Sequence, residues 1–228
     1  MKHANNRRFG FTLVELLVVV SIIGLLMSIL LPAFGKARLS AKKTQCANRL
    51  RSIFSATMMY VGDEDRLPPL NSEEHEGAYQ YNYLIYDGKD FDHCFGPLAR
   101  PYGIIRFTEQ LFCPVQKNRF HMLGTDLNPW PYQQNMDTRA GYGRRYGLSG
   151  KSFSQLERVF AYAADLMHLP EVVRSAHKTG VNVVYTDGHA QWVQDPGILT
   201  DNELTKPFDP RDNAIVKKIW KMLDRAGR

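Results

Sequence analysis

The N-terminal part of the chain contains an apolar run from Phe11 to Phe34, in which the only ionisable side chain is Glu15. As an α-helix, a run of about 24 residues reaches roughly 35 Å, enough to cross a hydrocarbon core of about 30 Å with some tilt. A secretory signal peptide is the first alternative, but its apolar region is normally about 7–15 residues and ends in an A-x-A-like cleavage site. This run is longer and no such site follows it. The sequence therefore predicts a membrane-spanning helix over residues 11–34.

Glu15 requires an explanation, because a carboxylate at the centre of a membrane helix costs about 2.5–3.5 kcal/mol and usually has a function. Cleavage after Gly10 would turn Phe11 into a new N-terminus, four residues before Glu15. The free amine of Phe11 would then be a partner for Glu15 of a neighbouring subunit. The alternative is a carboxylate near the membrane interface that reaches out to water.

The segment Gly10-Phe11-Thr12-Leu13-Val14-Glu15 resembles the processing site of type IV pilins and type II secretion pseudopilins. The resemblance implies that a prepilin peptidase cuts between Gly10 and Phe11, that Phe11 is then N-methylated, and that Glu15 assists assembly. Pro32 stands where this family often has a helix-kinking proline. Residues 1–10 would then be a leader. The expected partners are the prepilin peptidase, other pilin or pseudopilin subunits (a homo-polymer) and the inner membrane.

Charge counting does not decide which way the helix crosses the membrane, because basic residues lie on both sides of the run. Lys2, Arg7 and Arg8 precede it, and a second basic group follows it: Lys36, Arg38, Lys42 and Lys43. The peptidase of the resembled family acts on the cytoplasmic side. We therefore expect a single-pass protein of the inner (cytoplasmic) membrane whose C-terminal domain is periplasmic, and which passes into a filament on assembly.

The composition argues against nucleic acid as a partner. The 228 residues carry a formal charge of +6, and without Lys2, Arg7 and Arg8 the charge is +3. The remaining basic residues are scattered and match no nucleic-acid-binding motif. With the leader and the apolar run set aside, the remaining length suits one globular domain rather than two large ones.

Helical periodicity continues beyond Phe34. Apolar positions recur at three-, four- and seven-residue intervals, which places them on one helical face: Leu39, Cys46, Leu50, Ile53, Thr57 and Tyr60. Gly62 is a suitable end for the helix. The sequence thus predicts an N-terminal helix over residues 11–62 and a globular pilin-like domain over residues 63–228.

A β-hairpin is predicted around Asp187-Gly188, because alternating apolar segments flank this pair and Asp-Gly suits a two-residue type I′ turn. The spacing His177-x9-Asp187-Gly188 resembles the C-terminal signature of a prepilin-processing-associated family of planctomycete type, and places the hairpin motif at residues 177–193. One interpretation makes His177, Asp187 and His189 a metal or catalytic set. The other, which we favour, gives His177 a structural hydrogen bond and uses Asp187 and Gly188 for the turn.

The three cysteines have different expected environments. Cys46 lies on the apolar helical stripe and is predicted to be a buried thiol. Cys94 and Cys113 both lie in the globular part, where an exported domain can oxidise them, so they are the candidate disulfide pair. The odd number of cysteines leaves the oxidised and reduced forms both open. A nucleophilic Cys113 is less favoured, because no base is identifiable near it in the sequence.

No cofactor is predicted. The chain has no C-x-x-C or His-x3-His spacing, which argues against a zinc site. Calcium is kept as the alternative, since Asp195, Asp201 and Asp209 resemble the calcium loop of major pseudopilins, although their spacing does not establish it. Asp209 and Pro210 start a terminal helix well, which is predicted over residues 210–226 with its apolar face packed on the domain.

Together these features predict an α+β fold in which a long N-terminal membrane-spanning helix packs on a small antiparallel β-sheet domain. The expected function is that of a structural pilin or pseudopilin subunit without enzymatic activity, in a type II secretion or type IV pilus-like filament. Two alternatives stay open. One is a membrane-tethered metal-binding or enzymatic domain that uses His177, Asp187 and His189, and the other is a minor pilin at a filament tip that serves in adhesion.

Overall fold

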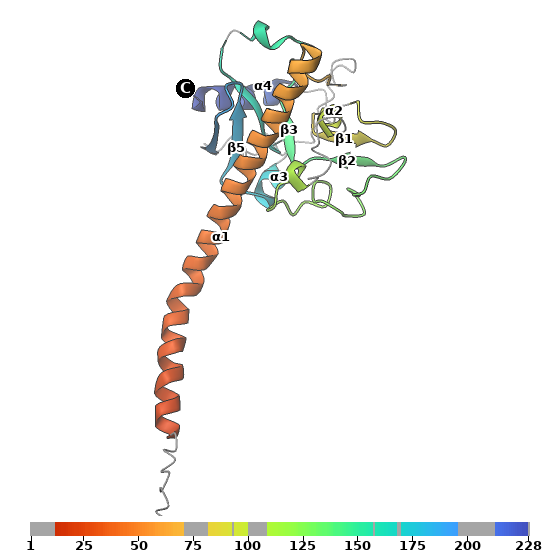
Figure 1. Ribbon diagram of the computed structural model, residues 1–228. Coiled ribbons are helices and arrows are strands. Elements are labelled where there is room, and N and C mark those ends of the chain that lie inside the picture. Colours follow the sequence, from red (N-terminus) through yellow and green to blue (C-terminus); the bar gives the residue numbers. More distant parts are fainter. Residues whose placement is uncertain are drawn as a thin grey trace, which may run out of the picture. The chain divides into compact units, whose positions relative to one another are not determined.

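The structure, a computed structural model, describes residues 12–70, 82–92, 94–99, 109–156, 158–167, 170–195 and 213–227 (Figure 1). The chain divides into two compact units, Met1–Ala41 and Lys42–Arg228. The predicted leader, Phe11, and the predicted helix start at Pro210 lie outside the described residues, as do Asp201 and Asp209.

Helix α1 (Leu13–Glu64) is one continuous element that belongs to both units, and it passes Pro32 without interruption. Its apolar side chains from Leu13 to Phe34 are exposed. Among the helices of the described ranges, α1 is the one with the length and composition to cross a membrane. The helix ends at Glu64 and is followed by Asp65, which adopts a left-handed φ of 54°.

The part of α1 that lies in the second unit contributes a stripe of buried side chains to the core. These residues recur at helical spacing: Cys46, Leu50, Ile53, Phe54, Ala56 and Thr57. The stripe agrees with the predicted apolar face from Cys46 to Thr57, whereas Leu39 is exposed because it precedes the packed part of the helix. The Thr57 hydroxyl lies 3.0 Å from the Tyr162 hydroxyl of the sheet, which joins helix and sheet by a buried polar contact.

A four-stranded antiparallel sheet forms the centre of the second unit, with its strands in the order β3-β4-β5-β6. The strands are β3 (Tyr142–Arg144), β4 (Ala161–Asp165), β5 (Gly180–Tyr185) and β6 (Ala190–Gln194), with the short helix α3 (Pro170–Ser175) between β4 and β5 and the 3-10 turn η4 (Phe153–Gln155) before β4. A separate two-stranded sheet pairs β1 (Leu84–Asp87) with β2 (Asp137–Arg139), beside α2 (Gly96–Ala99). The predicted α+β fold with a small antiparallel sheet is confirmed.

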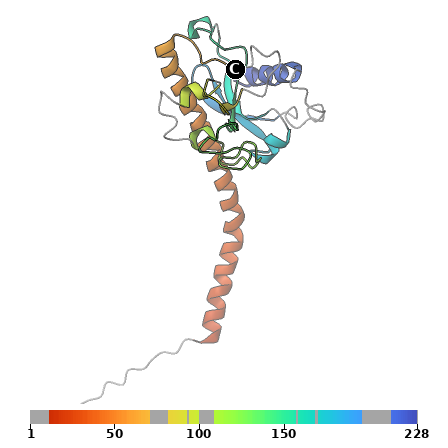
Figure 2. The ribbon, with the colours of Figure 1, turned by 90° about the vertical axis from the view of Figure 1, so that its right-hand side faces the viewer.

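The two faces of the four-stranded sheet are covered by different helices, α1 on one side and α4 (Asn213–Ala226) on the other (Figure 2). Successive residues of a strand point to opposite faces. Val184 of β5 accordingly joins the core cluster of the α1 stripe. Val183 and Tyr185 join the cluster that contains Trp220 of α4. Val181 belongs to the same cluster as Val183 and Tyr185, so these three alternate residues share one face of the sheet.

The β5–β6 turn differs from the predicted type I′ turn. The Gly188 N–H donates to the Tyr185 carbonyl at 2.9 Å, and the Tyr185 N–H donates to the His189 carbonyl at 2.9 Å, so the loop contains the three residues 186–188. Only Gly188 has a positive φ, at 85°, among these loop residues. Three-residue hairpin loops place glycine at this left-handed position, whereas a type I′ turn requires positive φ at Asp187 as well.

The stretch 115–152 contains many glycines, prolines and asparagines, residues that are typical of loops. It contains β2 and β3, and β3 supplies an edge strand of the main sheet. A segment of three residues is too short to show the alternation of apolar and polar residues by which a strand is predicted from sequence. Tyr142 and Arg144 of β3 are nevertheless completely buried.

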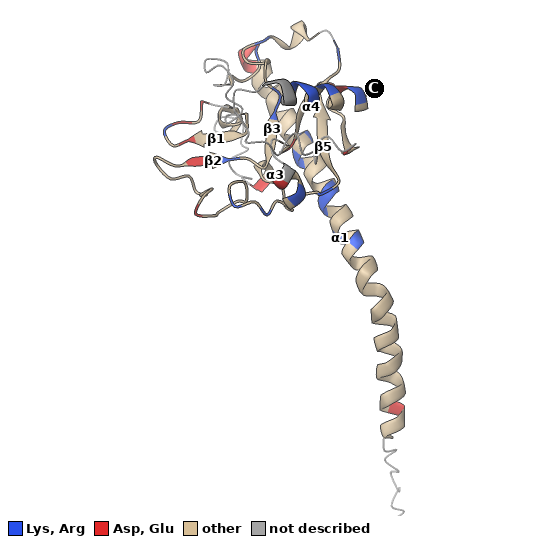
Figure 3. Cartoon of the chain, turned by 180° about the vertical axis from the view of Figure 1, so that it is seen from behind, with Lys and Arg blue, Asp and Glu red and all other residues tan. Residues whose placement is uncertain are grey.

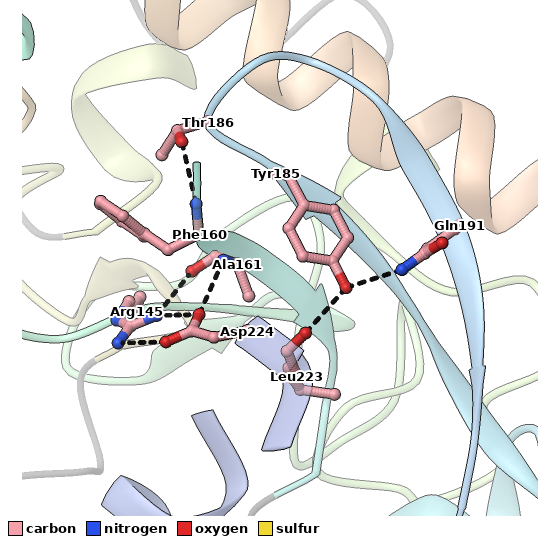
Figure 4. A network of polar contacts seen from close by, with 8 residues as sticks. All are labelled: Arg145, Phe160, Ala161, Tyr185, Thr186, Gln191, Leu223 and Asp224. Atoms are coloured by element: carbon pink, nitrogen blue, oxygen red, sulfur yellow. Dashed lines mark hydrogen bonds and ion pairs between the residues drawn. The ribbon is translucent and has the colours of Figure 1, made fainter. Parts of the chain in front are cut away.

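Polar contacts anchor α4 to the sheet (Figure 4). The Arg145 guanidinium donates to both carboxylate oxygens of Asp224 at 2.5 and 3.0 Å, and the Ala161 N–H donates to Asp224 at 3.0 Å. The Tyr185 hydroxyl donates to the Leu223 carbonyl at 2.9 Å. The paired side chains of Arg145 and Asp224 are only 18% and 9% exposed, so this ion pair is well protected from solvent.

Replacing Asp224 tests this anchor. Asp224→Ala leaves the Arg145 charge and the Ala161 N–H without their partner, and we expect it to lower the free energy of unfolding by about 3 kcal/mol. Urea unfolding of the full-length chain in detergent, followed by tryptophan fluorescence, measures the change. The control is Asp126→Ala, which removes the carboxylate of the exposed Arg119–Asp126 pair and should leave the transition almost unchanged. Equal effects of the two substitutions would contradict the anchoring role.

Replacing Gly188 tests the hairpin loop. A Cβ at this position would meet the Phe54 ring of α1 at 3.3 Å, in addition to the strain of the left-handed φ. We expect Gly188→Ala to destabilise the protein by about 1–2 kcal/mol. The control, Gly62→Ala, adds a Cβ in open space within α1 and should stabilise the chain by about 0.5–1 kcal/mol. The same unfolding assay applies, and a neutral Gly188→Ala would contradict the proposed loop geometry.

Candidate functional site

The N-terminal end of α1 is closed by a reciprocal pair of hydrogen bonds between Thr12 and Glu15. The Thr12 N–H and hydroxyl donate to Glu15 Oε2 at 2.8 and 2.7 Å, and the Glu15 N–H donates to the Thr12 hydroxyl at 3.3 Å. This is a capping box, in which the first helical residues satisfy each other's unpaired groups. The Thr-x-x-Glu spacing that produces it is visible in the sequence, although the two roles predicted there for Glu15 were assembly and an interfacial carboxylate that reaches water.

The capping box leaves part of the Glu15 carboxylate available. All the contacts that it makes to Thr12 use Oε2, and no residue of the described part engages Oε1. Beyond this end the first part of α1 is almost uniformly uncharged (Figure 3). A single carboxylate, held in a fixed position by its own helix, therefore begins a long exposed apolar surface. Gly10 and Phe11, the predicted cleavage and methylation positions, lie outside the described residues.

The residues of the His-x9-Asp-Gly motif do not form a common site. His177 precedes β5 and Asp187 follows it, so the strand separates them by on the order of 20 Å. Asp187 instead lies 2.6 Å from the His189 ring, in an exposed turn where the two side chains are 44% and 39% exposed. The alternative of a set made of His177, Asp187 and His189 is therefore corrected, because the motif spans the two ends of one strand.

The predicted Cys94–Cys113 disulfide is also corrected. All three cysteines are free thiols in the structure. The Cys94 thiol donates to the Asn82 carbonyl at 2.7 Å, and its burial raises its pKa to about 12. The sulfur in contact with Cys113 is that of Cys46, at 3.0 Å, because the packing of α1 brings Cys46 to this loop.

His177 joins the two thiols in a second candidate site, which lies in the unit Lys42–Arg228. Its Nε2 atom lies 3.4 Å from Cys113 Sγ and 3.2 Å from Asp165 Oδ2. One donor atom from each of Cys46, Cys113, Asp165 and His177 lies within 4.8 Å of the others, and all four residues are buried. We call this group the four-donor cluster.

Each member of the four-donor cluster is positioned by a different element. Cys46 is on α1, Asp165 is the last residue of β4, and His177 lies between α3 and β5. The Cys113 loop packs so closely on Gly141 that a Cβ there would lie 2.3 Å from the Cys113 nitrogen. Asn182 of β5 fixes Asp165, since its backbone N–H and its side-chain amide donate to Oδ2 at 2.7 and 2.8 Å.

The four-donor cluster favours charged forms of two members. Burial disfavours the imidazolium of His177, but the contacts with Asp165 and Cys113 outweigh burial and raise its pKa to about 10. Burial likewise opposes a Cys113 thiolate, yet the contacts with Cys46 and His177 lower the Cys113 pKa to about 7. The contact with Cys113, followed by burial, raises the pKa of Cys46.

This arrangement is not that of a catalytic Cys-His-Asp triad. In a triad, one ring nitrogen of the histidine contacts the nucleophile and the other contacts the carboxylate. Here the same atom, His177 Nε2, contacts both Cys113 and Asp165. The Cys113 residue is also only 5% exposed, which denies a substrate direct access to the sulfur. The donor atoms instead converge on one point.

The four-donor cluster could not be predicted from the sequence, for a physical reason. Zinc sites are found from sequence by short spacings such as C-x-x-C, which place two ligands on one turn. The four donors here come from a helix, a strand and two connecting segments, and the helix–sheet packing alone brings them together. The available signals were indirect, namely a cysteine on the apolar stripe of α1 and a histidine three residues before the first residue of β5.

Comparison with known proteins places the N-terminal part of the chain in a known group. The family profile described as the prokaryotic N-terminal methylation motif matches residues 5–31. The chain is 35% identical over 84 residues to the type IV major pilin protein PilA of Myxococcus xanthus (strain DK1622), a match that covers 36% of this chain and 38% of PilA. This chain thus spans less than half the length of that relative. No solved structure matches the chain significantly.

Two shorter relatives are matched over most of their length. The chain is 33% identical over 81 residues to the ComG operon protein 3 homolog of Bacillus licheniformis, covering 35% of this chain and 84% of that protein. It is 32% identical over 82 residues to the competence protein ComGC of Halalkalibacterium halodurans, covering 36% and 80%. With the methylation motif and the long apolar helix, these matches show that the chain belongs to the family of type IV pilin-like proteins.

Proposed function

We propose that this protein is a structural subunit of a type IV pilus-like or type II secretion filament, anchored in the inner membrane until it assembles. The observation that carries the proposal is the first part of α1, where every residue from Leu13 to Phe34 is exposed and Glu15 is the only charged one. Such a surface is stable in a lipid bilayer or against the same segment of other subunits, but not in water.

The proposal includes the maturation of the chain. A prepilin peptidase would cleave between Gly10 and Phe11, and Phe11 would be N-methylated. This route requires the leader on the cytoplasmic side and the unit Lys42–Arg228 outside the membrane. The methylation-motif match over residues 5–31, which includes Gly10, Phe11 and Glu15, supports the route.

Glu15 would control assembly through its unused carboxylate oxygen. Its Oε2 is held by Thr12, and its Oε1 has no partner among residues 12–70. In an apolar surrounding, an amine of a neighbouring subunit that reaches Oε1 would be strongly favoured over an unpaired carboxylate. The processed N-terminus of Phe11 is the amine that we propose.

The type IV major pilin and the two competence proteins among the relatives support a non-catalytic role for the chain. We propose that residues from Lys42 onward form the outer part of the filament, while α1 up to Phe34 forms its centre. The exposed lysines of α4, Lys217, Lys218 and Lys221, would then face away from the sheet and toward solvent.

Replacing Gly10 tests the cleavage step. Gly10→Val puts a branched side chain at the proposed scissile bond, and we expect the cellular protein to keep its leader and begin at Met1. N-terminal mass spectrometry of the protein recovered from its own organism measures this directly, with wild type expected to begin at methylated Phe11. Wild-type protein that still begins at Met1 while filaments form would overturn the proposal.

Replacing Glu15 separates its charge from its capping role. Glu15→Gln retains an oxygen that accepts from Thr12, since glutamine also serves in capping boxes. We expect Glu15→Gln to be processed normally but to reduce the amount of filament recovered by shearing by at least about 90%, because the negative charge is what pairs with the neighbouring amine. Ser21→Ala is the matched control in the same segment, because the Ser21 hydroxyl donates only to the Leu17 carbonyl of its own helix. Normal filaments from Glu15→Gln would show that capping, and not charge, is the role of Glu15.

A further inference from the structure

We propose that Cys46, Cys113, Asp165 and His177 bind one Zn²⁺ ion, which fastens α1 to the sheet within the unit Lys42–Arg228. This site is independent of the proposed assembly role of the N-terminal segment. The inference rests on the kind, position and burial of the four donors.

The donor types suit zinc. The four-donor cluster offers two sulfurs, one imidazole nitrogen and one carboxylate oxygen. Zn²⁺ is bound in proteins by these three donor types, and structural sites hold four of them tetrahedrally. Calcium and magnesium take oxygen ligands, so two thiol donors argue against both ions. Thiolates together with imidazole favour zinc or another soft first-row metal.

The distances are close to those of a tetrahedral site. With metal–ligand bonds of about 2.0–2.3 Å, the edges of a tetrahedron are about 3.3–3.8 Å long. The observed edges are 3.0 Å between Cys46 and Cys113, 3.4 Å between Cys113 and His177, and 3.2 Å between His177 and Asp165. Since all four donor atoms lie within 4.8 Å of one another, the required adjustments are about 1 Å or less.

Burial and one unpaired atom also indicate a ligand. The exposed fractions of the residues are 0% for Cys46, 5% for Cys113, 2% for Asp165 and 7% for His177. Asp165 Oδ2 is already engaged by Asn182, but the buried Asp165 Oδ1 has no hydrogen-bond partner among the described residues. Buried polar atoms are rarely left unpaired, and a metal held by both oxygens of the Asp165 carboxylate would satisfy Oδ1 as well as Oδ2.

The surroundings of the four-donor cluster resemble the outer shell of a metal site. Outer groups that hold the ligands in place are a regular part of such sites. Asn182 orients the Asp165 carboxylate, and the Tyr142 hydroxyl contacts the Cys46 thiol. The Trp192 ring lies edge-on to the His177 ring at 5.6 Å, with Lys43 Nζ 3.7 Å from the centre of the Trp192 ring. With both thiols deprotonated and the His177 imidazole neutral, as metal binding requires, the occupied site carries one net negative charge, and Lys43 contributes a positive charge beside Trp192.

A Cys46–Cys113 disulfide is the competing state of the same two sulfurs. It would consume both sulfur donors and leave the convergence of Asp165 and His177 on the same point without a role. Closing the 3.0 Å gap to a bond of about 2.05 Å also requires an external oxidant. The two states make opposite predictions for the number of free thiols in the zinc-loaded protein.

The test uses the full-length chain, purified in detergent under reducing, metal-free conditions and then loaded with Zn²⁺ or Co²⁺. Elemental analysis after dialysis should find one zinc per chain, and zinc should raise the melting temperature. Loading with Co²⁺ should give the intense visible bands of tetrahedral cobalt together with a thiolate-to-cobalt charge-transfer band. The double substitution Cys46→Ser, Cys113→Ser should lose the zinc and this band, whereas Cys94→Ser, which alters the third buried thiol, should keep both.

A variant outside the ligand set distinguishes a built site from a chance one. Asn182→Ala removes the side-chain hydrogen bond to Asp165 and should weaken zinc affinity about 10–100-fold, measured by competition with a chromophoric chelator. Absence of zinc from the wild type, zinc retained by the double variant, or cobalt bound without a thiolate band would each overturn the proposal. A Cys46–Cys113 disulfide in zinc-loaded wild type would also overturn it. If the double variant does not fold, the cobalt spectra of wild type and Cys94→Ser decide.

Discussion

Burial of one side of α1 against the four-stranded sheet is the interaction on which the second unit depends. Cys46, Leu50 and Ile53 are completely inaccessible to solvent, and Phe54 lies over the β5–β6 turn. A fully buried aliphatic side chain contributes about 1.5–3 kcal/mol, so this stripe alone is comparable with the net stability of an ordinary domain. The same packing brings Cys46 to Cys113 and His177, and therefore also creates the four-donor cluster.

The sequence was most informative where one physical requirement dominates. The apolar run is unbroken and long enough to cross a membrane, the stripe from Cys46 to Thr57 has helical spacing, and α1 follows both closely. β5 and β6 were predictable because alternating apolar residues flank a glycine turn, although the turn has three loop residues. The predicted packing of the terminal helix agrees with the burial of Ile219, Trp220 and Leu223.

Sequence reasoning failed where the arrangement depends on contacts between distant segments. β3 has three residues and no visible periodicity, and it is a strand because it pairs with β4. The cysteine pairing was mistaken because proximity was inferred from membership of the same domain, whereas Cys46 reaches Cys113 from the helix. Asp165 was not a candidate at all, since an aspartate at the end of a strand carries no signal until its neighbours are known.

The fixed spacing of the His-x9-Asp-Gly motif sets the distance between two contacts that the sheet makes with α1. His177 belongs to the cluster that includes Cys46, and Gly188 makes room for Phe54, two turns further along α1. Along α1, Cys46 and Phe54 are about 12 Å apart. Strand β5 crosses the helix at an angle, and its length must bring His177 to Cys46 and Gly188 to Phe54 at the same time. Inserting a single residue into β5 would turn every following side chain to the opposite face. The length of the motif is therefore set by the packing of α1 on the sheet. A change in the length of the motif requires a compensating change in the positions of the contact residues on α1.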